Sequence, residues 1–174
     1  LDVEKCRRLP NTELAQLWRD HYSRRPFHVA ISMSGAHFQA WMDGSQRHPT
    51  CIVPLGRHPG WETFMVQHRH QDSATCQVGF ARLRDYQTYG PEGAQPVLTA
   101  TAYGDFVTEG GVGLLAGSFA EGLVSREEAG ALLAGCSEVY ARLGEHVRLF
   151  NEQPDSFDYG AFLTAFEAVV NLEK

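Results

Sequence analysis

Apolar side chains at helical spacing predict helices near both ends of the chain. A first stripe, between Asn11 and Tyr22, consists of Leu14, Leu17, Trp18 and Tyr22. The strongest stripe follows a Ser-Arg-Glu-Glu capping box that begins at Ser125. Its members are Ala129, Leu132, Leu133, Cys136, Val139, Tyr140, Leu143 and Val147. After a turn at Pro154, a last helix has Tyr159, Phe162, Leu163, Phe166 and Val170 on one face.

Short apolar or alternating segments between these helices predict a run of strands. The expected strands are 27–32, 51–55, 61–69, 74–83, 97–103 and 112–121. One short helix interrupts them, with Ser34 as its cap and a stop at Asp43-Gly44-Ser45. The polar segment 70–73 is short enough for an antiparallel hairpin, and Tyr89–Gly93 is interpreted as a loop.

This order of elements defines the expected fold class. Consecutive strands with short connections pair antiparallel, and helices gathered at the two ends of the chain must cover the sheet. We therefore expect a single α+β domain over residues 1–174, with a mainly antiparallel sheet of five to six strands flanked by N- and C-terminal helices. Residues 1–10 are expected to be flexible.

Charge and composition exclude several functions. A net charge of −6 argues against nucleic acid as a partner, and no apolar run is long enough for membrane insertion. The four cysteines lie far apart, which favours reduced, buried thiols over a disulfide framework. Because the chain begins at Leu1, we expect it to be processed or trimmed, with any targeting peptide outside the sequence.

Motifs that would indicate catalysis or a cofactor are weak. The run Gly110–Gly117 lacks the Lys-Ser/Thr of a phosphate loop, so a turn at Glu109-Gly110-Gly111 and a closely packed strand are favoured. His68-x-His70, with Asp72 nearby, offers too few ligands for zinc, and surface histidines are favoured. No catalytic, cofactor-binding or metal-binding residue is assigned, and we expect a protein that is not an enzyme.

Binding of another protein is the remaining interpretation. The segment from Arg57 to Trp61 combines an arginine and a tryptophan, which are residue types that anchor interfaces. The other interpretation of Trp61 is the start of a core strand. Two alternative functions stay open: a small metal-dependent hydrolase using His68, His70 and Asp72, and a small-ligand-binding module using the concave face of the sheet.

Several motifs occur in one order along most of the chain. They are Trp18 with Tyr22, Pro54–Phe64, Tyr86-Gln87-Thr88-x-Gly90, Glu109–Leu114 and Phe150-Asn151-x-x-Pro154-x-x-Phe157-x-Tyr159. Over residues 11–166 this pattern resembles the mitochondrial ATP synthase assembly factor 1 family, in which the Tyr-Gln motif closes a strand. Two positions depart from the family pattern, because Gly56 and Gly104 stand where the family typically has proline.

The resemblance implies a chaperone of the mitochondrial matrix that needs no cofactor. Such a chaperone binds the unassembled β subunit of the ATP synthase catalytic head and prevents its aggregation before it pairs with the α subunit. We expect the free protein to be monomeric. The candidate partner-binding residues are Arg57, Gly60, Trp61, Phe64, Tyr86 and Gln87.

Overall fold

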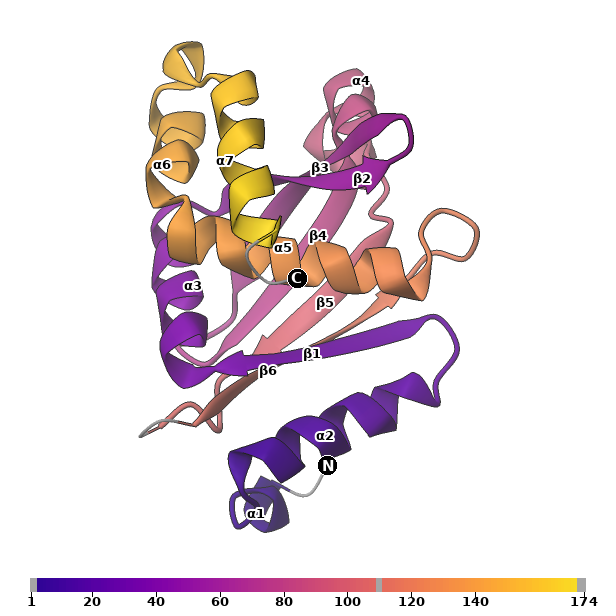
Figure 1. The fold of residues 1–174 in the computed structure, drawn as a ribbon, viewed down its shortest axis with the longest axis vertical. Helices are drawn as coiled ribbons and strands as arrows, with labels where there is room; N and C mark the ends of the chain where they lie inside the picture. Colours follow the sequence, from indigo (N-terminus) through magenta and orange to yellow (C-terminus); the bar gives the residue numbers. More distant parts are fainter. Residues whose placement is uncertain (1–2, 109–110, 172–174) are drawn as a thin grey trace.

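A curled antiparallel sheet is the centre of the fold (Figure 1). The structure is a computed structural model that describes residues 3–108 and 111–171. Within these residues six strands pair in the order β1-β6-β5-β4-β3-β2. Their bounds are His28–Ser34 (β1), Thr50–Arg57 (β2), Gly60–His70 (β3), Thr75–Arg82 (β4), Leu98–Tyr103 (β5) and Val112–Phe119 (β6). The expected class, a single α+β domain with a mainly antiparallel sheet, is confirmed.

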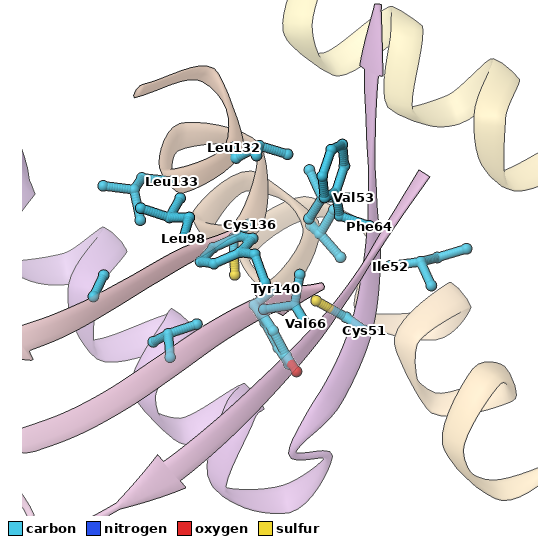
Figure 2. Packing of buried hydrophobic residues seen from close by; sticks show 14 of the residues in the cluster. Cys51, Ile52, Val53, Phe64, Val66, Leu98, Leu132, Leu133, Cys136 and Tyr140 are labelled. Atoms are coloured by element: carbon cyan, nitrogen blue, oxygen red, sulfur yellow. The ribbon is translucent and has the colours of Figure 1, made fainter. Parts of the chain in front are cut away.

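One face of the sheet holds the main core. Helix α3 (Gly35–Arg47) and helix α5 (Arg126–Arg142) cover this face, and α5 runs across the strands (Figure 1). Figure 2 shows Cys136 and Tyr140 of α5 among side chains of β2 and β3. Each large apolar side chain that is removed from water here contributes about 1.5–3 kcal/mol.

Two further helices close the edge of the sheet at β2. They are α6 (Gly144–Glu152) and, after a short 3-10 turn at Pro154–Ser156, α7 (Tyr159–Asn171). The Asn151 amide donates to the backbone oxygen of Thr50 at 2.7 Å and accepts from its hydroxyl at 2.7 Å. This contact satisfies polar groups on a strand that has only one neighbour.

Among the described residues, two helices cover the opposite face over β1 and β6. Helix α1 (Val3–Cys6) and helix α2 (Asn11–Ser23) form a second, smaller core there with Leu114 and Ala116. The Trp18 indole donates to the backbone oxygen of Leu115 at 2.9 Å. Residues 3–10, for which flexibility was expected, thus include a short helix whose Cys6 is buried.

The segment after β4 differs from the prediction. Instead of a longer strand, a strand end at Tyr86-Gln87 and a loop, residues Leu83–Gly93 form helix α4, which bends at Gly90 and Pro91. None of its residues is fully buried, so the sequence lacks the apolar stripe that identifies a helix. Gly90 has a φ of 74°, which glycine adopts without strain.

Helix ends agree with the capping motifs but not with every expected stop. Ser125 and Glu128 form the expected capping box, and the Ser34 hydroxyl accepts from the backbone N–H of His37. However, α3 continues past Gly44 to Arg47. A Cβ at Gly44 would lie 2.8 Å from Tyr140 Cδ1, so this glycine allows α3 and α5 to pack closely rather than ending α3.

The expected continuous helix after Ser125 is two helices. The backbone of Leu143, at φ −118° and ψ 30°, separates α5 from α6. Val147 remains buried, now through α6, which is why the apolar spacing continues across the break. The expected turn at Glu109-Gly110-Gly111 involves residues 109 and 110, which lie outside the described residues.

The four cysteines are buried free thiols, as expected. Burial raises the pKa of the Cys76 thiol to about 12, and burial likewise raises the pKa of Cys136. Both thiols are therefore protonated at neutral pH and poor nucleophiles. Among the described residues, no helix combines the length and the apolar character that a membrane span requires.

Candidate partner-binding surface

The turn between β2 and β3 presents Trp61 to solvent. Arg57 pairs with Gly60 and Gly56 pairs with Trp61, so only His58 and Pro59, joined by a cis peptide bond, form the turn. The indole is 39% exposed and edge-on to the Phe166 ring, with centroids 6.3 Å apart. A Cβ at Gly56 would lie 3.8 Å from the indole, so the departure from proline at position 56 lies beside this ring.

Ion pairs hold the end of this hairpin that lies next to the turn. The Glu62 carboxylate lies 2.7 Å from Arg57 Nε, 3.0 Å from Arg82 Nε and 3.8 Å from Arg84 Nη2. Arg57 also lies 3.5 Å from the Glu128 carboxylate and donates to the backbone oxygen of Leu123 at 3.0 Å. Since Glu128 belongs to the capping box, Arg57 ties the hairpin to the start of α5.

Apolar side chains surround the same hairpin. Tyr159, on α7, shares a 2.7 Å hydrogen bond with the Thr63 hydroxyl, and Leu123 lies in the loop that Arg57 contacts. Both side chains are exposed, as is Trp61. We use the name hairpin surface for residues 57–63, 82–84 and 87, which line a hollow of 780 Å³, together with Leu123 and Tyr159.

Four of the six predicted partner-binding residues lie in this hollow, namely Arg57, Gly60, Trp61 and Gln87. Tyr86 lies next to Gln87 on α4 and is partly buried against the core. Phe64 requires a correction: its side chain is 0% exposed and belongs to the main core. It anchors β3 to the main core and cannot contact a partner while the sheet is intact.

The remaining members of the surface were not identified from the sequence. Tyr159 was interpreted as part of an apolar helix face. Its hydroxyl, however, forms a hydrogen bond with Thr63 of β3, which lies 96 residues earlier in the sequence. Glu62 and Arg82 meet because Phe64 pairs with Arg82, a register that the sequence alone does not specify. Leu123 carries no sequence signal, since it lies in an irregular loop before Ser125.

Replacing Glu62 with glutamine tests whether the ion cluster holds the hairpin. The substitution Glu62→Gln keeps the shape but removes the carboxylate that pairs with the partly buried Arg82 and one of the two that pair with Arg57, so we expect a loss of about 1–2 kcal/mol in unfolding free energy. The control is Glu145→Gln, which removes a carboxylate from an exposed pair with Arg148 on α6. Equal losses in urea unfolding of the two variants would contradict the expectation.

His68, His70 and Asp72, which were considered as metal ligands, each make other contacts. The His68 ring lies in the core, against Trp41 and Tyr140, and is not a surface group as the sequence suggested. His70 Nε2 lies 3.0 Å from the Ser45 hydroxyl, and Asp72 accepts from two backbone N–H groups of its own turn. No group of three metal-ligating side chains occurs among the residues that the structure describes.

Burial also sets the protonation state of His68. Desolvation lowers the pKa of the ring to about 3, against the opposing effect of a hydrogen bond to the backbone oxygen of Pro49. A histidine that stays neutral and has no access to solvent is suited to packing rather than to proton transfer. The hairpin surface, which does not include His68, offers exposed aromatic rings and an arginine held by two carboxylates.

The comparison with protein families supports one of the functional hypotheses. A family model described as ATP11 protein matches residues 1–163 of the chain. The chain belongs to the ATP11 family. This is the family of the ATP synthase assembly factor 1, and its members are mitochondrial factors associated with a chaperone role in ATP synthase assembly. The resemblance drawn from the sequence motifs is thus confirmed, whereas no curated protein sequence matches the chain.

Proposed function

We propose that this chain is a chaperone that binds the unassembled β subunit of the ATP synthase catalytic head in the mitochondrial matrix. It shields the surface that the α subunit later covers, and it acts without catalysis or a cofactor. The observation that carries the proposal is the ATP11 family match over residues 1–163. We further propose the hairpin surface as the contact with the β subunit.

The geometry of the hairpin surface supports this role. Interface hot spots are enriched in tryptophan, tyrosine and arginine, and side chains that are already ordered lose less entropy on binding. Here Trp61 and Tyr159 are exposed, and Tyr159 is held to the same strand through Thr63. Arg57 is fixed by Glu62 and Glu128 before any partner arrives. A micromolar complex, worth about 8 kcal/mol, would hold a client and still yield it to its permanent partner.

Co-expression with an isolated β subunit tests the client. We expect the β subunit to become more soluble and to co-purify with the chain. Absence of both effects for the wild-type chain would overturn the assignment of the β subunit as the client. The position of the contact is tested separately by variants of the hairpin surface.

The substitution Trp61→Ala is expected to weaken β-subunit binding at least about tenfold, because it removes the central exposed ring of the surface. The matched control is Leu17→Ala on α2, since Leu17 is 42% exposed and Trp61 39%. Binding is measured by titration, and thermal unfolding reports whether each variant is folded. Equal affinity for both folded variants would mean that the hairpin surface is not the contact.

The substitution Arg57→Ala is expected to weaken β-subunit binding as well, with a measurable loss of stability from the broken ion pairs. Comparison with Glu62→Gln, which disturbs the same ion pairs but retains the guanidinium, separates the two contributions. If Arg57→Ala binds no more weakly than Glu62→Gln, the guanidinium does not contact the β subunit.

A further inference from the structure

A groove lies on the uncovered part of the sheet, on the side that carries α2. It has a volume of 590 Å³ and is lined by residues of β1, β3, β4, β5 and β6, with Tyr22 of α2 and Arg25, which follows that helix, as a wall. Residues directly opposite each other in a sheet share a face. The register therefore places Gln67, Thr99, Ser118 and His28 in one row across the strands, and Arg69, Gln77 and Thr101 in the next. We call this surface the open-face groove.

A glycine forms the floor of this groove. Gly79 pairs with Gln67 on one side and with Thr99 on the other, so the first row has no side chain at its centre. A Cβ built at Gly79 would meet no atom within 4 Å. The depression above Gly79 is therefore open space rather than a site of close packing.

The lining of the groove is basic although the protein is acidic. The chain has 21 acidic and 15 basic residues, yet none of the described aspartates and glutamates lines the groove, whereas Arg25, Arg69 and His28 do. Arg25 lies over the Tyr22 ring at 5.4 Å. Arg69 forms no salt bridge with any residue that the structure describes. Desolvation, and to a smaller extent the positive charge of Arg25, lowers the pKa of the neighbouring His21.

We propose that the open-face groove binds an extended, acidic segment of a protein partner. Carboxylates of such a segment would pair with Arg69 and Arg25, which no carboxylate of the groove neutralises. Gln67, Gln77, Thr99 and Thr101 present amides and hydroxyls that donate to and accept from peptide groups. A site for a small ligand is usually enclosed, whereas this one is an open sheet face whose rows carry arginine, glutamine and threonine side chains.

This groove is separate from the hairpin surface, because the two hollows share no lining residue. The inference thus goes beyond the proposed function and adds a second, electrostatic contact. Such a contact increases the rate of encounter and weakens as salt screens it. It can be tested on the chain alone, so that its failure would leave the proposed binding of the β subunit untouched.

The probe is a fluorescent peptide of alternating glutamate and threonine, about eight residues long. In an extended conformation a peptide of this length reaches across all five strands that line the groove. Fluorescence anisotropy at low salt is expected to show saturable binding that weakens with added salt. A peptide with glutamine in place of glutamate is expected to bind at least about tenfold more weakly. Absence of saturable binding, or equal affinity for the two peptides, would overturn the proposal.

Two variants locate the binding in the groove. Arg69→Glu reverses the charge, and Gly79→Val fills the depression above β4 with a residue that favours strands. Each is expected to weaken peptide binding about tenfold or more, and circular dichroism checks that each is folded. The control is Arg47→Glu, an exposed arginine at the end of α3, on the other side of the sheet.

The control also separates a specific site from general charge attraction. Arg47→Glu is expected to change the peptide affinity less than about twofold. An equal loss for Arg47→Glu and Arg69→Glu would reduce the effect to net charge and overturn the groove assignment. Inorganic phosphate that binds as tightly as the acidic peptide would also overturn it, since the site would then recognise small anions rather than a segment.

Discussion

Lowering the pH from 7 to 5 is expected to reduce the free energy of unfolding by about 2 kcal/mol through His68 alone. The His68 ring is enclosed by Trp41 and Tyr140, at centroid distances of 5.6 Å and 5.0 Å. Desolvation keeps its pKa near 3 in the folded state, against about 6.5 in the unfolded chain. Below pH 6.5 only the unfolded chain gains this proton, so the stabilisation present above that pH is lost progressively as the pH falls toward 3.

Urea unfolding of the wild type and of His68→Asn at several pH values measures this contribution. The asparagine amide can replace the ring Nδ1 as a donor to the Pro49 oxygen, 3.1 Å away, but it does not titrate. The variant is expected to be less stable at pH 7 because of the cavity and to lose less stability toward pH 5. Parallel pH profiles would contradict the expectation. Burial also lowers the pKa of His70, but His70 is present in both proteins.

The substitution Gly113→Ala is expected to destabilise the fold by about 3 kcal/mol, through overpacking between β6 and α3. A Cβ at position 113 would lie 2.1 Å from Phe38 Cδ2 and 2.5 Å from Phe38 Cβ. The base of the Phe38 side chain cannot move away by rotation, so α3 itself would have to shift. Because Phe38 and the neighbouring Trp41 are both buried, that shift would disturb the main core.

Gly79→Ala is the matched control for Gly113→Ala. Both glycines lie in strands of the same sheet, but a Cβ at Gly79 meets nothing within 4 Å. The control is expected to be neutral or more stable by up to about 1 kcal/mol, since alanine loses less conformational entropy on folding. Urea unfolding compares the two. Equal effects would show that glycine flexibility, and not the contact with Phe38, decides the result.

A double-mutant cycle assigns the clash to Phe38. In the Phe38→Ala background the methyl group added at position 113 has room, so the cost of Gly113→Ala is expected to fall below about 1 kcal/mol. An unchanged cost of the second substitution would place the strain elsewhere on β6. The cycle also measures how strongly Phe38 and the strand beneath it depend on each other.

The parts of the fold that the sequence predicts well are those that bury a periodic face. The stripes of α2 and α5 and the capping box at Ser125 required only local information. The structure confirms the capping box and the buried face of α5, and it confirms that of α2 except at Leu17, which is exposed. Helix α4 was missed because its side chains are not buried deeply enough to impose a helical period. The break at Leu143 was missed for the opposite reason, since α5 and α6 both bury residues at spacings that continue one stripe.

The candidate site was predicted where residue type matters and not where register matters. Arg57 and Trp61 were identified as an arginine and an aromatic ring in a polar turn, and both line the hairpin surface. Phe64 was grouped with them as the last residue of the Pro54–Phe64 motif that carries the family resemblance. Side chains alternate along a strand, however, so residues three apart point to opposite faces, and Phe64 points into the core. The open-face groove depends on five strands pairing in register, which no single segment encodes.

The pairing of β1 with β6 has a kinetic consequence. His28 pairs with Ser118, and Trp18 reaches Leu115, so the first strand and the helix before it find their partners only near residue 118. Contacts at such separation form slowly, because the loop between them must close first. A chain made from its N-terminus therefore keeps Trp18 and the edge of β1 without partners until most of it exists. An unpaired strand edge of this kind favours aggregation during folding, so the late pairing of β1 is the step at which this assembly factor is most exposed to it.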